Sequence, residues 1–109
     1  MITATFHLNG SRLESFQVEG HSGLAQQGED ILCAAVTSAV RLVECTVNDV
    51  LGLEAGVKVK EDKALISLKL PGGLGQTNES TCQALLTGLM VYLSQLQEEY
   101  PDNIIVMEV

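Results

Sequence analysis

The sequence predicts a small α+β domain in which two helices pack on one mixed or antiparallel β-sheet, with the elements in the order ββαββαβ. Two observations lead to this fold class. Short segments in which apolar residues alternate with polar ones predict strands, and two longer segments with apolar residues at helical spacing predict helices. With 109 residues, of which 46% are hydrophobic, the chain is expected to form a single domain, residues 1–109, around its own core.

The chain begins with an expected β-hairpin. Apolar and polar residues alternate over residues 2–8, and a similar alternation returns around Phe16 and Val18. Asn9 and Gly10 stand between the two segments and suit a tight turn, because glycine accepts positive φ values. We therefore expect the first two elements to be adjacent antiparallel strands.

The middle of the chain is expected to hold a long helix and a second hairpin. From Asp30 to about Leu51, apolar residues recur at helical spacing, with Asp30 as the expected N-cap and Gly52 as the end of the helix. Residues 56–60 and 64–70 stand on either side of an E-D-K turn and predict two further strands.

The last third of the chain follows a P-G-G-L-G break. Apolar residues at helical spacing between Cys82 and Leu96 predict a second helix, which we expect to be capped at Asn78 or Ser80 and to end before Pro101. The closing segment I-I-V-M-E-V predicts a final strand.

Composition excludes several classes of protein. The chain carries 14 acidic and 6 basic residues, a net charge of −8, which disfavours contact with a phosphate backbone and is compatible with a basic protein partner or simply with solubility. With so few basic residues and four aromatic ones, we expect no direct binding of nucleic acid. No apolar run approaches the roughly 20 residues needed to cross a bilayer, and the first residues lack a signal-peptide pattern, so we expect a cytoplasmic protein that does not contact a membrane.

Residues 20–38, G-H-S-G-L-A-Q-Q-G-E-D-I-L-C-A-A-V-T-S, carry the strongest functional signal. A glycine-rich loop holds His21, and an apolar helix follows with Cys33 in its first turn. A helix N-terminus stabilises negative charge on sulfur, and a nearby histidine can hold the thiol proton. The pattern predicts Cys33 as a nucleophile and His21 as its general base. The loop is expected to move aside for a peptide and close over it, and its residues include Gly20, Ser22, Gly23 and Gly28.

The other titratable residues have plainer interpretations. Cysteine is often buried, and three cysteines in a chain expected to be cytoplasmic indicate thiols and not a disulfide framework. We expect Cys45 and Cys82 to lie in the core and His7 to be solvated on the polar side of its strand. Asp30 is more readily a helix cap than a catalytic acid, and its carboxylate opposes thiolate formation at Cys33.

Cofactor and metal sites find little support. The glycines match neither the phosphate-binding loop with its lysine nor the dinucleotide pattern G-x-G-x-x-G. His21, Cys33 and Asp30 would offer three zinc ligands without any C-x-x-C pair. We expect no cofactor and no metal.

These residues also carry a family resemblance. The segments G-H-S-G and G-E-D-I-L-C-A-A-V-T-S, in a small ββαββαβ chain, resemble the ribosomal-processing cysteine protease Prp family (YsxB-like proteins) over nearly the whole chain. The family pattern is G-H, a short variable loop, and then D-[IV]-[VL]-C-A-[AG]-x-S. The chain departs from it at Thr37, where many relatives have serine, although threonine keeps the hydroxyl.

The resemblance implies an activity and a partner. It implies a cytosolic cysteine endopeptidase that removes a short N-terminal extension from large-subunit ribosomal protein twenty-seven. By similarity, Cys33 would be the nucleophile and His21 the general base, with Asp30 and Thr37 as supporting residues. The alternative is a non-catalytic ribosome-associated binding or assembly factor whose loop clasps a peptide without cutting it.

Two expectations concern surfaces. Two apolar helices and a terminal strand that looks like an exposed edge favour a homodimer, as does the resemblance, whereas a central strand paired on both sides would favour a monomer. For the substrate, we expect contacts from the loop at residues 20–29 and from the P-G-G-L-G segment, where Leu74 offers apolar surface.

Overall fold

The structure, a computed structural model, describes residues 1–21, 23 and 30–109. Its centre is a five-stranded sheet with the strand order β3-β4-β2-β1-β5. The strands are β1 (Ile2–Asn9), β2 (Arg12–Glu19), β3 (Gly56–Lys60), β4 (Leu65–Lys69) and β5 (Ile104–Glu108). β1 and β5 pair in parallel and all other neighbours are antiparallel, so the sheet is mixed. The predicted order ββαββαβ is confirmed.

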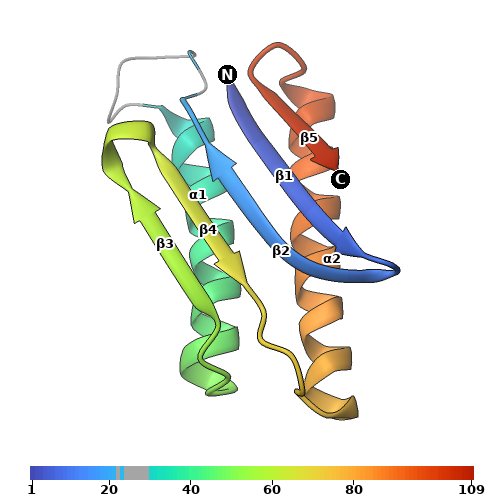
Figure 1. Cartoon of the computed structure of the whole chain (residues 1–109). Helices are drawn as coiled ribbons and strands as arrows, with labels where there is room; N and C mark the ends of the chain where they lie inside the picture. The colour runs from blue at the N-terminus through green and yellow to red at the C-terminus, as the bar shows by residue number, and fades with distance from the viewer. Residues whose placement is uncertain (22, 24–29) are drawn as a thin grey trace.

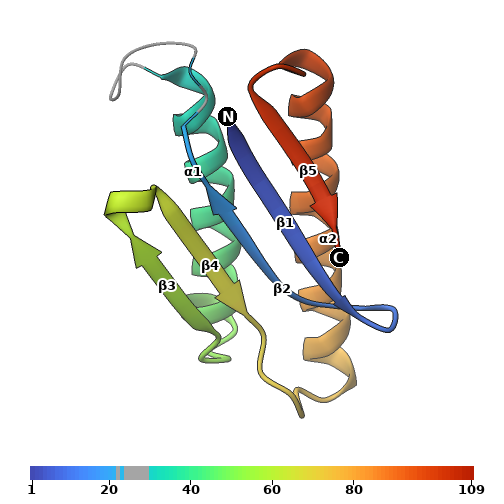
Figure 2. The same ribbon diagram turned by 45° about the horizontal axis from the view of Figure 1, so that its top comes forward.

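Two long helices cover one face of this sheet. Helix α1 (Ile31–Glu44) lies on the β4 side and continues as one π-helical segment, η1 (Cys45–Val50), while α2 (Gln76–Glu99) lies on the β5 side (Figures 1 and 2). A short 3₁₀ turn, η2 (Glu61–Lys63), joins β3 to β4. Among the described residues, no helix lies on the opposite face of the sheet, which explains the alternation of apolar and polar residues along the strands.

The ends of α1 follow the sequence, but the start of α2 does not. Asp30 is the N-cap of α1, as predicted, and Gly52 with φ of 66° follows the helical segment. The prediction of a cap at Asn78 or Ser80 is wrong, because α2 begins at Gln76 with Gly75 as its N-cap. Gly75 adopts φ of 79°, which glycine tolerates, and its carbonyl accepts the Glu79 N–H at 3.0 Å, so the helix begins earlier.

The core lies between the sheet and the two helices. The rings of Phe6 and Phe16, on neighbouring strands, have centroids 5.6 Å apart. Fully buried residues from both helices pack against them, among them Val40, Val47, Leu86 and Leu93. Burial of this apolar surface is the main force that holds the helices on the sheet.

Residues Ile31–Val50 are also long and apolar enough to cross a membrane by length and composition. The core helix of a soluble protein meets the same test. Here Leu32, Val36, Val40 and Val43 of this segment belong to the core, and 28% of its apolar window is buried inside the molecule.

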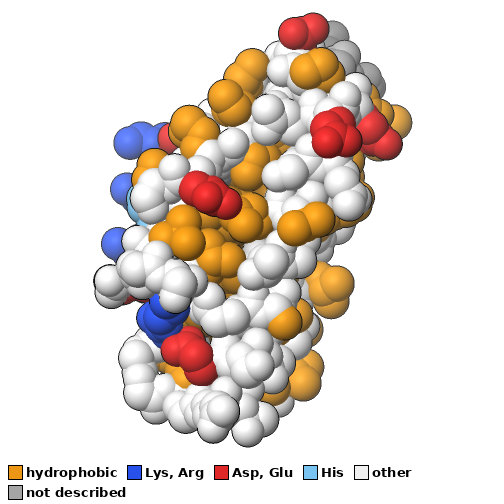
Figure 3. Space-filling view, turned by 90° about the vertical axis from the view of Figure 1, so that its right-hand side faces the viewer, with side chains coloured by type: hydrophobic (Ala, Val, Ile, Leu, Met, Phe, Trp, Pro, Cys, Tyr) orange, Lys and Arg blue, Asp and Glu red, His pale blue; other side chains and the backbone are white. Residues whose placement is uncertain are grey.

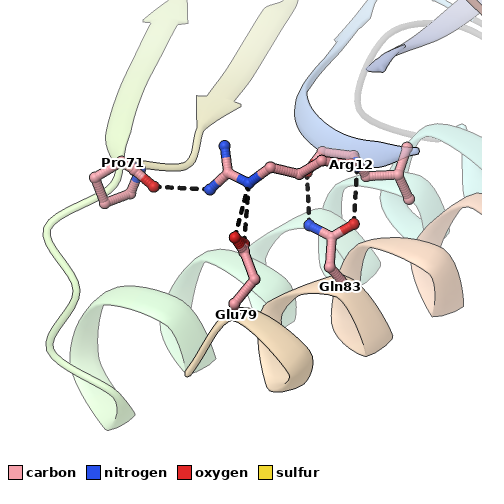
Figure 4. A network of polar contacts seen from close by, with 5 residues as sticks. Arg12, Pro71, Glu79 and Gln83 are labelled. Carbon is pink, nitrogen blue, oxygen red and sulfur yellow. Dashed lines mark hydrogen bonds and ion pairs between the residues drawn. The ribbon is translucent and has the colours of Figure 1, made fainter. Parts of the chain in front are cut away.

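The turn end of the β1–β2 hairpin is bound to α2 by side chains (Figure 4). A β-bulge interrupts the pairing between His7 and Leu8. The Gln83 amide accepts the Leu13 N–H at 2.8 Å and donates to the Leu13 carbonyl at 2.9 Å. Gln83 thus takes the place of a strand partner for Leu13.

Arg12 adds a second connection at the same place. Its Nε lies 3.0 Å from both carboxylate oxygens of Glu79, and its guanidinium donates to the Pro71 carbonyl at 2.8 Å (Figure 4). The hairpin, the start of α2 and the segment before α2 are thereby held together.

The terminal strand β5 is an edge strand, since β1 is its only partner in the sheet. The alternative of a central strand is therefore wrong. The Val109 N–H donates to the Phe6 carbonyl, and the Val109 carbonyl accepts the Leu8 N–H. The backbone groups of odd-numbered residues at this end of the chain therefore point toward β1, and the Val106 N–H points away from it. Gln97 of α2 accepts that N–H at 2.9 Å. The outer edge of β5 is thus partly capped from within the molecule, which opposes pairing with a further strand.

We expect Gln83→Ala to destabilise the fold by about 2 kcal/mol, because it leaves both backbone groups of Leu13 without their partner. Urea unfolding followed by circular dichroism measures this difference. Gln95→Ala, on the exposed side of the same helix, is the matched control and should change stability by less than about 0.5 kcal/mol. Equal effects of the two substitutions would contradict this role of Gln83.

Candidate functional site

A groove of about 610 Å³ runs beside α1, between that helix and the tip of the β3–β4 hairpin. Both residues that the sequence singled out, His21 and Cys33, line it. One stripe of α1 forms a wall of the groove, and its members are Cys33, Val36, Thr37, Val40, Arg41 and Glu44. The other residues come from the N-terminus, the end of β2 and the β3–β4 hairpin.

Cys33 is held at the start of α1 by Asp30. One carboxylate oxygen, Oδ1, accepts the Cys33 backbone N–H at 3.1 Å, and Oδ2 accepts a hydrogen bond from the Cys33 thiol at 3.2 Å. Asp30 is only 8% exposed, whereas Cys33 is half-buried and lines the groove. A single carboxylate therefore both begins the helix and orients the sulfur.

The place of Cys33 in the helix also has an electrostatic consequence. The residue is the third of α1, within the first turn. Backbone N–H groups at a helix N-terminus favour negative charge, and this effect supports a thiolate, whereas the adjacent Asp30 carboxylate opposes one. A group that removes the thiol proton is needed to shift this balance.

His21 reaches the groove from the end of β2. It directly follows Gly20, which has φ of +93°, and a Cβ placed on Gly20 would overlap the carbonyl oxygen of Met1. Only glycine allows β2 to end so close to the N-terminus of β1. The His21 side chain is exposed and lines the same groove as Cys33, so the fold brings the expected base and nucleophile to one site.

The remaining expected site residues fall in two groups. Thr37 lies one helical turn after Cys33 and lines the groove, and Gly23 is exposed with φ of +78°. Ser22 and Gly28 lie outside the described residues. Movement of the loop at residues 20–29 stays a prediction.

The structure adds groove residues that the sequence analysis missed. Val59 of β3 and Ile66 of β4 line the groove, and Val59 is apolar yet 62% exposed. Periodicity identified this hairpin but carried no signal that it lies beside α1. The expectation of a contact from the P-G-G-L-G segment is wrong, since residues 71–75 lie at the opposite end of the molecule from the start of α1 (Figure 1), and Leu74 does not line the groove.

The two other cysteines differ from each other. Cys82 is fully buried, as predicted, and burial raises the pKa of its thiol, with a further increase from Glu79 and an opposing effect of Arg12. The prediction that Cys45 lies in the core is wrong, because it is exposed. Val43 and Val47 occupy the buried side of the helix, and a residue two positions from each lies near the opposite side.

Within the described part of the chain, no three His, Cys, Asp or Glu side chains come together in a way that could hold a metal ion. The groups available at the groove include the Cys33 thiol with its Asp30 partner, the His21 imidazole and the Thr37 hydroxyl.

Comparison with known sequences gives one clear family. The chain matches the family model of the cysteine protease Prp over residues 1–105. It is 30% identical over 105 residues to the ribosomal processing cysteine protease Prp of Bacillus subtilis (strain 168), and the alignment covers 95% of this chain and 94% of that relative.

Solved structures share the fold. The essential ribosomal processing protease Prp from S. aureus, in complex with a covalently linked product peptide, matches with a TM-score of 0.83 and 23% identity over 100% of both chains. A second structure of the S. aureus protease contains a substrate peptide. SMU.848 from Streptococcus mutans matches with a TM-score of 0.84 and 24% identity, covering 100% of this chain and 94% of that one.

We expect the thiols of the native protein to react with iodoacetamide at distinct rates. Cys82 should react only when the chain unfolds, because it is buried and its raised pKa keeps it protonated. Exposed Cys45 serves as the internal reference for an ordinary thiol. Mass-spectrometric mapping of a time course gives the three rates, and labelling of Cys82 as fast as Cys45 in the folded protein would contradict this assignment.

Proposed function

The chain belongs to the Prp family of cysteine proteases, and from this premise we propose that it uses Cys33 and His21 to remove the N-terminal extension of large-subunit ribosomal protein twenty-seven. The observation that carries the proposal is that a thiol at a helix N-terminus and a histidine line one groove. The proposed substrate is a ribosomal protein, so we expect the enzyme to act in the cytoplasm.

The proposed reaction begins with transfer of the Cys33 thiol proton to His21. The resulting thiolate attacks the carbonyl carbon of the scissile peptide bond, and a tetrahedral intermediate forms. As the C–N bond breaks, His21 returns the proton to the leaving amine and an acyl-enzyme remains on the sulfur. Water, deprotonated by His21, then hydrolyses the thioester and restores the thiol.

Asp30 serves in this proposal as a positioning residue. It holds the Cys33 thiol through Oδ2 and the backbone of the same residue through Oδ1. The thiol is thus stored in a defined orientation, and its proton leaves for His21 when a substrate fills the groove. Thr37, one turn further along α1, lines the same groove.

The groove suits an extended peptide. Its stripe on α1 runs from Cys33 to Glu44, which at about 1.5 Å per residue is about 16 Å, or roughly five residues of extended chain. The exposed Val59 supplies apolar surface along it, and the buried Val36 and Val40 line its floor. The S. aureus relative has been solved with a substrate peptide and with a product peptide, which supports a peptide as the occupant here.

We expect Cys33→Ala to abolish cleavage of the extended ribosomal protein, and His21→Ala to lower kcat/KM by about 10²–10⁴-fold, because the nucleophile or its base is lost. Gel analysis of cleavage by purified proteins measures both. Cys45→Ala is the matched control and should cleave at the wild-type rate. Trimming by Cys33→Ala at the wild-type rate would refute the nucleophile assignment, and intact binding without any cleavage by the wild type would favour the non-catalytic alternative.

Asp30→Asn separates the two roles of Asp30 when the reaction of the protein's thiols with iodoacetamide is followed. Asparagine caps helices about as well as aspartate, so the fold should be retained. Loss of the carboxylate charge removes a group that opposes the thiolate. Alkylation of Cys33 at neutral pH should therefore become faster relative to Cys45, whereas a purely structural role of Asp30 would leave this ratio unchanged.

We also propose that two copies associate through the outer face of the helical layer. The centre of this face is uncharged and exposed. Its residues are Ala34, Ser38 and Leu42 of α1, Cys45 of η1, and Ala84, Gly88 and Val91 of α2. Leu42 is 67% exposed, and the space beside Gly88 is open. A glycine in the middle of a helix costs stability unless another backbone approaches it, and a second copy would provide that approach.

The edge of β5 is a weaker candidate for this contact. Gln97 already occupies the Val106 N–H. The view onto α2 and β5 in Figure 3 shows apolar side chains with acidic side chains beside them. The association proposed here therefore uses side chains of the helices and not extension of the sheet.

Sedimentation at micromolar concentration tests this association. The wild type should sediment as a dimer of the 11.7-kDa chain, and Leu42→Glu should shift it to monomer, because a buried charge without a partner opposes the contact. Met107→Glu, at the exposed edge strand, is the control and should leave the dimer intact. A wild type that sediments at 11.7 kDa, or a dimer lost only in Met107→Glu, would overturn the proposed interface.

A further inference from the structure

The positive charge of the chain is concentrated on one hairpin. All four lysines, Lys58, Lys60, Lys63 and Lys69, lie between residues 58 and 69, on β3, β4 and the turn between them. Of the two arginines, Arg12 is paired with Glu79 and Arg41 lines the groove beside Cys33. The β3–β4 hairpin is therefore the main basic element of an acidic protein.

Part of this charge faces the side of the sheet that has no helix. The strand register places Lys58 opposite Ser67, and Lys69 opposite Ser15, which in turn pairs with His7. These side chains surround a second, shallow groove of about 340 Å³. We call its residues His7, Ser15, Gln17, Lys58, Ser67 and Lys69 the lysine face. Lys and His side chains are visible along the left edge of the molecule in Figure 3.

Few carboxylates compete for the lysine face. Glu14 lies 3.9 Å from the Lys69 ammonium, at the margin of an ion pair, and the Lys69 side chain remains 71% exposed. Within the described part of the chain, no ion pair involves Lys58. Both ammonium groups are thus available to a ligand.

The net charge of −8 does not cancel this local charge. At physiological ionic strength the screening length is about 8 Å, so the potential at the lysine face is set by its own residues more than by distant carboxylates. The total charge lowers affinity and limits binding to close approach, which is why the sequence alone argues against nucleic acid.

We propose that the lysine face is a docking surface for RNA, which it contacts through the phosphate backbone. Lysine ammonium groups, hydroxyls and a side-chain amide are the donors that commonly bind phosphate oxygens. An acidic peptide would be better served by the paired donors of arginine, and the residues that line this groove include lysines but no arginine.

The same composition predicts binding without sequence preference. Phe6 and Phe16 are buried, so neither phenylalanine ring of β1 and β2 is available for base stacking. The choice of RNA over other polyanions rests on the proposed function, since a ribosomal protein is a partner of RNA. Docking on RNA would raise the local concentration of the protease near such a substrate.

Fluorescence anisotropy of a labelled RNA stem-loop of about 20 nucleotides tests the proposal at about 0.05 M salt, where phosphate contacts are strong. We expect a Kd on the order of 100 μM, weakening with salt at a log–log slope of about −2, as two phosphate contacts require. Lys58→Glu should weaken binding at least about fivefold. Lys63→Glu makes the same charge change in the turn outside the lysine face, and it should weaken binding less than about twofold.

The outcomes are distinct. No binding by the wild type, or equal losses in Lys58→Glu and Lys63→Glu, would overturn the proposal, the latter because net charge alone would then act. A polyglutamate peptide that binds more tightly than the RNA would assign the surface to an acidic protein partner instead. Cleavage of a short peptide should be unchanged in Lys58→Glu. Absence of cleavage in the wild type with RNA binding intact would count against the proposed function and not against the lysine face.

Discussion

The two oxygens of the Asp30 carboxylate accept the backbone N–H and the thiol of the same residue, Cys33. The start of α1 and the position of the reactive sulfur therefore have one physical origin. Cys33, Thr37 and Val40 stand at positions i, i+4 and i+7 of α1, so they lie on one side of the helix and line the same groove.

The sheet provides the other half of the site, and it does so through close approach of backbones. Gly20 lets β2 end against the first residue of β1, and His21 follows at once. The β3–β4 hairpin extends the sheet beside α1 and contributes the exposed Val59. The groove is consequently formed by three segments that are distant in sequence, and its walls include a helix and two strands. Sites built in this way combine a fixed nucleophile with room for a substrate to enter.

Glutamine side chains of α2 perform a related task at two places where the strand ladder is incomplete. Gln83 pairs with Leu13 at the bulged end of the first hairpin, and Gln97 pairs with Val106 at the outer edge of the sheet. Backbone groups that would otherwise be unpaired are thus satisfied by a helix. At β5, the Gln97 contact opposes pairing of this edge with a strand of another molecule. Any association of this protein is thereby directed toward side-chain surfaces.

The sequence by itself determined the local structure, because the signals involved are local. Alternation along β1 and β2, the helical spacing from Leu32 to Val47, the cap at Asp30 and the burial of Cys82 all depend on residues within one or two turns of each other. The motif around His21 and Cys33 likewise identified these two residues, which both line the groove. Only the tertiary structure decided the start of α2, where Gly75 makes a turn that no propensity predicts, and the exposure of Cys45, which depends on which side of the helix meets the sheet. The same holds for the position of the β3–β4 hairpin beside α1, for the parallel pairing of β5 with β1, and for the placement of Lys58 and Lys69 on the lysine face. Each of these follows from the packing of segments far apart in the chain, and the period of a single segment carries no information about its neighbour in space.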